Sequence, residues 1–179
     1  MILTHLDLVA LAESGAIENY DPANINGASI DLRLGDELLL ESRHNAGTVD
    51  LSAKGSPPFS PLEPESGEWI LEPGEFALAS TMERFWLPNN ICFEFKLRSS
   101  IARAGLNHSL AGFADPGWTD ATLTLELKNI LQYSKLALRP GLRIGQAVFY
   151  RGRPVPDEKS YSVRGRYNGQ SSPTISLGA

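Results

Sequence analysis

The sequence predicts an all-β domain, a barrel or a sandwich, and two observations support this. First, 12 prolines and 16 glycines divide the 179 residues into short pieces. Second, several of these pieces alternate apolar and polar residues, which is the period of a strand with one buried face. Neither an internal repeat nor a second domain is evident, so residues 1–179 are predicted to form one domain.

Residues 29–34, 91–97 and 122–127 show this alternation most clearly. In the third piece leucines alternate with threonines and with Glu126. Close-spaced turns between such pieces favour half-buried antiparallel strands. Glu126 is therefore expected on the polar face of its strand.

Two short helices are predicted among these strands. Thr4 can cap the first, whose leucines recur at helical spacing before Gly15 ends it. The second begins near Ser99, where two serine hydroxyls can cap it, and Gly105 stops it. A helix N-terminus presents free backbone N–H groups to an anion, so this second helix is a candidate phosphate contact.

Residues 42–68 are rich in Pro, Gly, Ser and Glu, and are predicted to be a surface excursion with little regular structure. A tolerated insertion is favoured over a functional lid. The final residues, 159–179, are treated below as a separate C-terminal segment.

Composition excludes several classes of protein. A net charge of −5 argues against broad nucleic-acid binding, although a local basic pocket is still possible. A single cysteine, Cys92, cannot form an intramolecular disulfide and reads as a buried structural thiol. The N-terminus lacks the pattern of a signal peptide, and no apolar run is long enough to span a membrane, so we expect a cytoplasmic protein.

The polar residues most suited to chemistry lie within residues 93–126. Arg98, Ser99, Ser100 and Arg103 stand close together and are followed by an Asp-Pro-Gly-Trp turn and by Glu126. Cations and hydroxyls suit a phosphorylated ligand, and a carboxyl group in a partly dry pocket suits proton transfer on a polar ring.

The chain resembles the dCTP deaminase / dUTPase superfamily, and specifically its dCTP deaminase branch, over most of its length. Five blocks in the family's order carry the resemblance: 28–35 (ASIDLRLG), 98–103 (RSSIAR), 124–129 (TLELKN), 139–146 (RPGLRIGQ) and 161–170 (YSVRGRYNGQ). The resemblance implies a distorted jelly-roll-like β-barrel of the dUTPase type with a few short helices. It also implies a homotrimer with sites at subunit interfaces.

The resemblance implies that Glu126 is the general acid/base of deamination. Replacing a ring amino group by water needs a group that takes a proton from the water and returns protons to the ring and the departing ammonia. Arg103 would orient Glu126, and Ser99 would hold the water or the intermediate.

The resemblance also implies a set of nucleotide contacts. Asp115 would accept from the 3′-hydroxyl, Trp118 would pack on the nucleoside, and backbone atoms of Ala111 would hold the cytosine ring. The predicted phosphate contacts are Arg98, Ser100, Gln146, Tyr161, Arg166, Tyr167 and Gln170. Residues 159–179 would fold over the nucleotide, with Arg166 where the family often has lysine.

Zinc is not expected, because one cysteine and three scattered histidines do not make the zinc pattern of other nucleobase deaminases. Magnesium is expected only as part of the substrate, bound to the triphosphate rather than to protein ligands. His108 is treated as structural despite its closeness to the site in sequence.

The leading prediction is a dCTP deaminase that releases dUTP and ammonia and so supplies dTTP synthesis. The first alternative is a bifunctional enzyme that also cleaves dUTP to dUMP and diphosphate. A plain dUTPase and a non-catalytic nucleotide-binding regulator are less favoured. Relative to the branch pattern, the interval from Arg103 to Asp115 is one residue short and the interval from Asp115 to Glu126 is one residue long.

Overall fold

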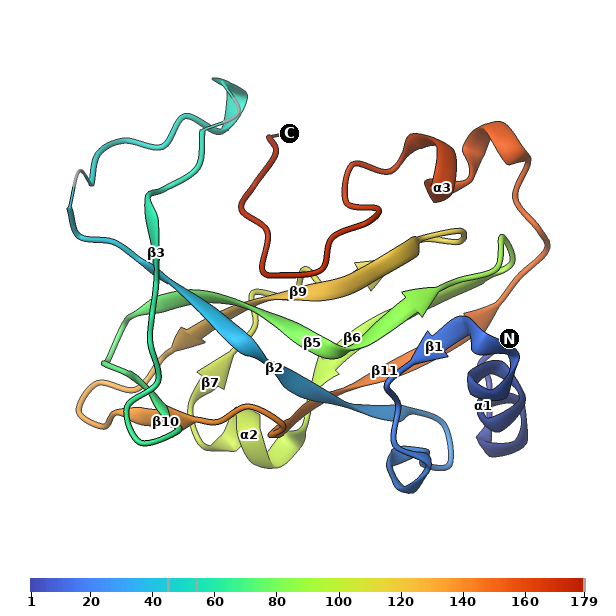
Figure 1. Ribbon diagram of the computed structural model, residues 1–179, viewed down its shortest axis with the longest axis horizontal. Helices are drawn as coiled ribbons and strands as arrows, with labels where there is room; N and C mark the ends of the chain where they lie inside the picture. The colour runs from blue at the N-terminus through green and yellow to red at the C-terminus, as the bar shows by residue number, and fades with distance from the viewer. Residues whose placement is uncertain (45, 54, 179) are drawn as a thin grey trace.

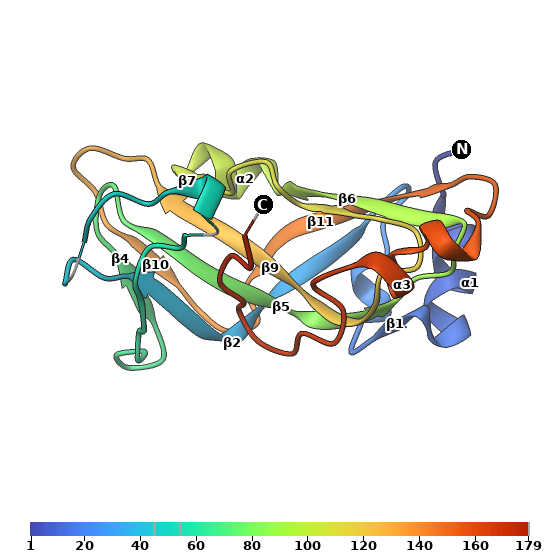
Figure 2. The ribbon, with the colours of Figure 1, turned by 90° about the horizontal axis from the view of Figure 1, so that it is seen from above.

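The computed structural model describes residues 1–44, 46–53 and 55–178. This part of the chain is built around a nine-stranded antiparallel sheet that curls into a half-barrel (Figures 1 and 2). Its strands run in the order β7-β9-β5-β2-β11-β6-β8, with β1 added to β5 and β3 added to β2, while β4 and β10 pair separately. The prediction of an all-β, barrel-like fold with a few short helices is confirmed.

The elements have the following bounds. The strands are β1 (Ile17–Glu18), β2 (Ile30–Glu41), β3 (Phe59–Pro61), β4 (Trp69–Leu71), β5 (Phe76–Trp86), β6 (Ile91–Leu97), β7 (Leu106–Asn107), β8 (Phe113–Ala114), β9 (Thr119–Asn129), β10 (Leu136–Leu138) and β11 (Arg143–Arg151). The α-helices are α1 (His5–Leu11), α2 (Ser99–Arg103) and α3 (Tyr161–Arg164). A π-helical turn follows α1 at Ala12–Ala16, and 3-10 turns lie at Pro22–Asn24, Leu51–Ala53 and Asp157–Lys159.

The three alternating pieces of sequence form β2, β6 and β9, as predicted. Their apolar faces fill the inside of the curled sheet, and the centre of this core is aromatic. Phe93 packs against Phe85 with ring centroids 4.8 Å apart, and Trp118 stacks on Phe85 at 5.6 Å. Each fully buried side chain of this size contributes roughly 1.5–3 kcal/mol.

Both predicted helices are present, but one predicted cap is wrong. Thr4 is the N-cap of α1, and the carboxylate of Asp7 accepts from its backbone N–H at 3.3 Å. In α2 the N-cap is Arg98, without a side-chain cap, so Ser99 is the first helical residue and leaves its hydroxyl free of the backbone. Arg98 has an extended backbone, so the helix starts after it, and its side chain pairs with Asp31. Gly105, with φ of +98°, ends the segment as predicted.

Three neighbouring strands of the half-barrel carry irregularities in their pairing. The β2–β5 register shifts between Leu34 and Leu38, and the β5–β9 register shifts between Ser80 and Arg84. The hydroxyl of Thr81 accepts from the backbone N–H of Leu123 at 3.0 Å and so replaces part of the interrupted ladder. Such bulges bend and twist a sheet, which suits its closure into a half-barrel.

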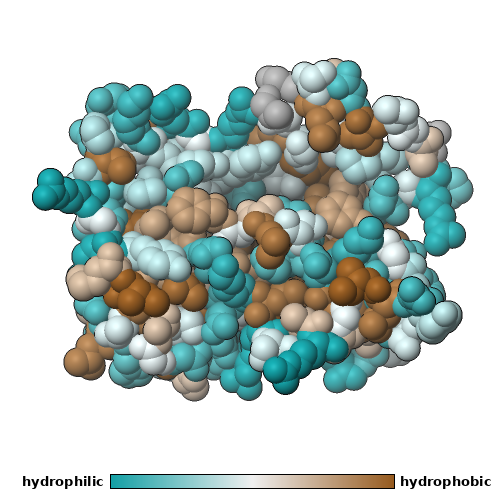
Figure 3. Space-filling view, turned by 180° about the vertical axis from the view of Figure 1, so that it is seen from behind, coloured by the Kyte–Doolittle hydropathy of each residue, from teal (hydrophilic) through white to brown (hydrophobic). Residues whose placement is uncertain are grey.

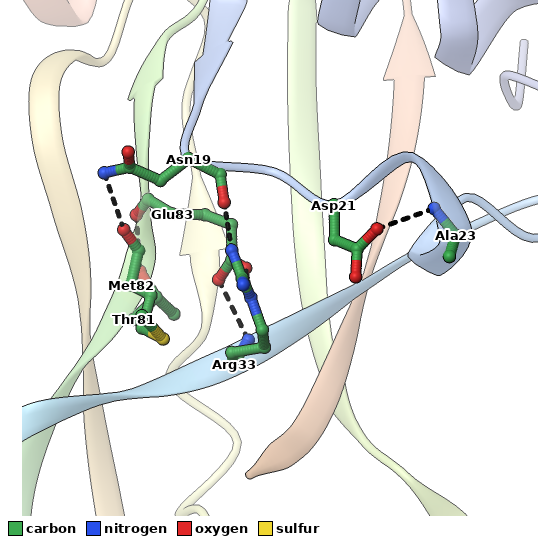
Figure 4. A network of polar contacts seen from close by, with 7 residues as sticks. All are labelled: Asn19, Asp21, Ala23, Arg33, Thr81, Met82 and Glu83. Carbon is green, nitrogen blue, oxygen red and sulfur yellow. Dashed lines mark hydrogen bonds and ion pairs between the residues drawn. The ribbon is translucent and has the colours of Figure 1, made fainter. Parts of the chain in front are cut away.

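A buried ion pair lies beside these bulges (Figure 4). Glu83 is fully buried and receives the guanidinium Nε of Arg33 at 2.8 Å and the backbone N–H of Arg33 at 2.9 Å. The guanidinium also donates to the backbone carbonyl of Asn19. Burial raises the pKa of Glu83, and the hydrogen bonds from Arg33 oppose that rise.

The C-terminal segment crosses β9, above it in Figure 1. The backbone N–H of Thr122 donates to the carbonyl of Gln170 at 3.0 Å, and the backbone N–H of Thr174 donates to the hydroxyl of Thr124 at 3.2 Å. Among its described residues, the excursion at 42–68 holds the turn Leu51–Ala53, strand β3 and an isolated bridge between Glu65 and Glu68. No helix in the described ranges has the length and apolar character needed to cross a membrane.

Candidate active site

A cavity of about 500 Å³ lies on the outer face of β5 and β9, beneath the C-terminal segment. It is lined by the loop before β8, by the turn before β9, by both strands and by the tail. Seven of the predicted site residues meet there: Ala111, Asp115, Trp118, Glu126, Tyr161, Tyr167 and Gln170. The topology therefore joins parts of the chain that are more than fifty residues apart.

Glu126 lies on the polar face of β9, as its place in the alternating pattern predicts, and is only partly exposed. Its cross-strand neighbour is Leu78, and Thr124 lies two residues away on the same face. Burial raises the pKa of Glu126 above the ordinary value for a glutamate, and only its own backbone opposes this. A carboxyl group with a raised pKa can take up and return a proton close to neutral pH.

Asp115 and Trp118 form the turn between β8 and β9. The backbone N–H of Trp118 donates to the carbonyl of Asp115 at 3.1 Å, and Gly117 adopts a φ of +83° that favours glycine. The Trp118 ring is only 4% exposed because it stacks in the aromatic core, and its indole N–H donates to the backbone of Tyr167 at 3.1 Å. Trp118 therefore anchors both Asp115 and the tail.

Gln170 is held in the cavity wall by two bonds to the backbone of Thr122. Its amide nitrogen donates to the Thr122 carbonyl at 2.6 Å. Its Oε1 is buried and has no hydrogen-bond partner, the only such side-chain atom in the described residues. An unsatisfied buried acceptor costs about 1–3 kcal/mol, so a ligand donor at this position would be favoured.

The remaining predicted site residues do not line this cavity: Arg98, Ser99, Ser100, Arg103, Gln146 and Arg166. Arg98 pairs with the buried carboxylate of Asp31 at 2.7 Å, and Gln146 accepts from the hydroxyl of Ser29 at 2.9 Å. Ser99, Ser100 and Arg103 are exposed on α2. Arg166 donates to the carbonyl of Gly178 within the tail. Within one chain, the predicted catalytic trio is thus not assembled in the cavity.

The cavity has an unbalanced charge. The described residues that line it include the carboxyl groups of Asp115 and Glu126 but neither lysine nor arginine. A triphosphate carries several negative charges and needs charge-assisted partners when it leaves water. The cavity of one chain therefore suits the sugar and base of a nucleotide better than its phosphates.

Sequence analysis missed one wall of the cavity, which the 42–68 excursion provides through Ser56, Pro57 and Phe59. The Phe59 ring packs on Phe76 of β5 with centroids 5.9 Å apart. The Pro-Pro-Phe run inside an otherwise polar stretch was the one available signal, but its partner in β5 could not be identified from sequence alone.

His108 and Cys92 belong to the packing rather than to the cavity. The buried ring of His108 meets Phe95 edge-on at 5.2 Å, and burial followed by the nearby Lys96 charge lowers its pKa. Burial raises the pKa of Cys92. Among the described residues, no group of three His, Cys, Asp or Glu side chains is arranged to hold a metal ion.

A family model described as dCTP deaminase-like matches residues 2–152. A relative from Thermobifida fusca is 40% identical over 182 residues, which cover 98% of this chain and 92% of that protein. This chain belongs to the dCTP deaminase-like family. A second relative, from a Nocardioides species, is 38% identical and covers 98% of this chain and 94% of its own length.

The fold agrees with that membership. The crystal structure of a 2′-deoxycytidine 5′-triphosphate deaminase from Agrobacterium tumefaciens superposes with a TM-score of 0.65 at 21% identity. The match covers 84% of this chain and 48% of that one. At this identity the likeness concerns the fold alone.

The names of the relatives correct the leading prediction of function. Both the Thermobifida and the Nocardioides proteins are named dCTP deaminase, dUMP-forming. The prediction of an enzyme that stops at dUTP is therefore wrong. Sequence analysis could not separate the two activities, because one nucleotide site can serve both.

Proposed function

We propose that this protein is a bifunctional enzyme that deaminates dCTP and cleaves the resulting dUTP, releasing ammonia, dUMP and diphosphate. Its family and the dUMP-forming relatives support this proposal. The structural observation that carries it is the half-buried Glu126, with its raised pKa, in a nucleoside-sized cavity shared with Asp115. The product dUMP would feed the synthesis of thymidine nucleotides.

Deamination adds water to C4 of the cytosine ring and expels the amino group. The Glu126 carboxylate takes a proton from the water while the water oxygen bonds to C4. Glu126 then gives that proton to N3. The remaining hydroxyl proton then moves through the same carboxyl group to the amino nitrogen. The C4–N bond breaks, ammonia leaves and a uracil carbonyl remains.

Selection of a deoxynucleoside would fall to the other groups of the cavity. Asp115 can accept from the 3′-hydroxyl, and the free Oε1 of Gln170 offers an acceptor to a ligand donor. Tyr161 and Tyr167 line the same cavity from the tail. Burial raises the pKa of Tyr161, so its hydroxyl stays protonated and can donate to a phosphate oxygen.

The second step acts on the triphosphate of the same nucleotide. Water attacks the α-phosphorus, and the bond from this phosphorus to the bridging oxygen of the β-phosphate breaks, leaving dUMP and diphosphate. The substrate enters as a magnesium complex. Arginine and hydroxyl groups are needed around the phosphates, where negative charge is concentrated.

A second copy of the chain would supply those groups. Arg103, Ser99 and Ser100 are exposed on α2, while the cavity with Glu126 has no cation in its described lining. A head-to-tail contact that joins one chain's α2 to the next chain's cavity would generate a closed ring if its rotation closes, and the resemblance implies that this ring is a homotrimer. Figure 3 shows apolar patches between polar ones on the surface. Leu110, 84% exposed, and the cavity residue Phe113, 57% exposed, would be covered by such a contact.

Product analysis tests the proposal directly. Purified protein is incubated with dCTP and magnesium, the nucleotides are separated, and ammonia and diphosphate are assayed. We expect ammonia, dUMP and diphosphate in equal amounts without accumulation of dUTP. If dUMP appears only from added dUTP and ammonia is absent, the protein is a dUTPase. If neither nucleotide is turned over, it is a binding protein.

A further inference from the structure

The side chains of β9 change faces part-way along the strand. After the change, odd-numbered residues such as Ala121 and Leu125 are buried in the core, and Glu126 lies on the opposite face. Before the change, the even-numbered Trp118 is in the core. In an uninterrupted strand, Trp118 and Glu126 would share a face because successive side chains alternate. Because this alternation is broken once, Glu126 lies on the face of β9 opposite to that of the buried Leu125, although Trp118, an even number of residues before it, is also buried.

The break is a one-residue bulge at Asp120. Phe85 of β5 pairs with Ala121 and Trp86 pairs with Thr119, so Asp120 has no cross-strand partner. Its φ is +55°, a left-handed conformation that aspartate and asparagine tolerate better than most residues.

Arg84 holds the bulge in place. Its Nε donates to the carboxylate of Asp120 at 2.9 Å, and its terminal nitrogen donates to the Asp120 backbone carbonyl at 3.1 Å. The guanidinium also lies 5.6 Å from the ring centroid of Trp86. Because both partners are partly exposed, the ion pair stabilises the fold little. The main effect of the ion pair is to hold the backbone of Asp120 in the bulge.

The same bulge supports the docking of the tail. The backbone N–H of Thr119 donates to the side chain of Asn168 at 3.1 Å, and the N–H of Gly169 donates to the Thr119 carbonyl at 3.3 Å. These bonds lie directly beside Asp120 and shortly before Gln170. The bulge therefore affects two sides of the cavity, Glu126 on β9 and Gln170 on the tail.

We propose that Asp120 and Arg84 are positioning residues of the active site. They determine which face of β9 each side chain occupies, so that Trp118 stays in the core while Glu126 faces the nucleotide. This inference rests on the proposed function only for its kinetic readout. Removing one residue would return β9 to regular alternation and turn either Glu126 inward or Trp118 outward. Neither residue touches the reacting atoms.

The test compares variants that keep the left-handed conformation with variants that oppose it. Asp120→Asn and Asp120→Gly should keep kcat for ammonia release within about threefold of wild type, since both residues tolerate positive φ. Asp120→Val and deletion of Asp120 should lower kcat by about 10²-fold, more than they raise KM, because small misplacements of catalytic groups cost that much. Arg84→Met should lie between, at about tenfold.

Two matched controls distinguish a change in the face that Glu126 occupies from a general loss of stability. Arg139→Met removes another exposed arginine–carboxylate pair, with Glu68, and should leave kcat unchanged. Asp36→Val places valine at an exposed aspartate of β2 outside the cavity and should also leave kcat unchanged. Melting temperatures identify any variant that loses activity through unfolding. If the deletion of Asp120 does not fold, Asp120→Val and Arg84→Met still decide the question.

If the wild-type protein releases ammonia and Asp120→Val has the same kcat and KM as the wild type, the proposal is overturned. If the wild-type protein releases none, the proposed function has failed instead. The bulge is then judged by the crystal structure of the deletion variant. Glu126 still on the cavity face beside a buried Trp118 would refute the assignment, and a flipped face would support it.

Discussion

Leu78 of β5 lies directly opposite Glu126 of β9, with both side chains on the cavity face of the sheet. The carboxyl group therefore has an aliphatic neighbour where a polar or cationic one would stabilise its charge. Phe76, two residues along β5, and Phe59 of the excursion extend this apolar wall. The wall excludes water, and this loss of solvation raises the pKa of Glu126.

Leu78→Thr should lower the pKa of Glu126 toward the ordinary glutamate value, because the hydroxyl and added water solvate the carboxylate. Deamination requires the ionised carboxylate before water attacks, so activity falls as pH drops through this pKa. The acidic limb of the kcat/KM profile should therefore move to lower pH in the variant. Leu40→Thr, in a half-buried position outside the cavity, is the control and should leave the limb in place. An unchanged limb in Leu78→Thr would mean that the limb belongs to another group.

Glu126→Gln should retain nucleotide binding and lose ammonia release by about 10²–10⁴-fold, since an amide cannot take up the proton of water. Binding is measured by calorimetry and turnover by ammonia assay. Glu94→Gln alters a strand glutamate of β6, paired with Lys96 outside the cavity, and should leave turnover unchanged. Substantial turnover by Glu126→Gln would remove this residue from the chemistry.

The fold was predictable because its signals are local. The alternation in β2, β6 and β9 and the glycines after the two helices act within a few residues of the chain. The wall contributed by Phe59 was not predictable, because it depends on a contact with Phe76 across the sheet. The serines of α2 were expected to cap their helix, yet Arg98 is the N-cap, and its side chain pairs with Asp31, which is distant in sequence.

The residues that meet in the cavity were easier to predict than which chain supplies the other predicted site residues. The resemblance predicts Asp115, Glu126 and Gln170 as site residues, and the structure brings them to one cavity. The sequence pattern could not tell whether Arg103 serves the cavity of its own chain or that of a neighbour. That question concerns the arrangement of chains, which local sequence patterns do not encode.

Mixed oligomers test whether the site is shared between chains. Arg103→Ala and Glu126→Gln are each expected to be inactive alone. Co-expressed in equal amounts, they should recover about a quarter of wild-type activity, because mixed trimers contain one interface with both native residues. Co-expression of Glu126→Gln with the double variant is the control, since no native Glu126 is then present. No recovery in mixed oligomers of demonstrated composition would place both residues in one chain's site.

Arg166→Ala should raise KM for dCTP by about tenfold or more and change kcat little, because a lost charge-assisted contact to phosphate is worth about 1.5–3 kcal/mol. In the structure Arg166 donates only within the tail, to Gly178, so it is free to exchange that partner for a phosphate oxygen. Arg164→Ala, at the exposed end of α3, is the matched control for loss of positive charge. Equal changes in KM for both variants would indicate a general effect of charge on the tail.

Arg33→Met should destabilise the protein by about 3 kcal/mol at neutral pH, because it leaves the buried Glu83 without its cation. The folded-state pKa of Glu83 is already raised by burial, and removing the hydrogen bonds and the charge of Arg33 raises it further. When a carboxyl group has a higher pKa in the folded than in the unfolded protein, the free energy of unfolding falls as pH rises through the folded-state pKa. Protonation of the group restores that free energy. The deficit in the free energy of unfolding, measured in urea, should therefore be larger at about pH 8 than at about pH 5.5. Arg43→Met removes an exposed partner of Glu75 and should change stability by less than about 0.5 kcal/mol at either pH. A deficit that does not depend on pH would show that Arg33 acts through packing rather than through the charge of Glu83.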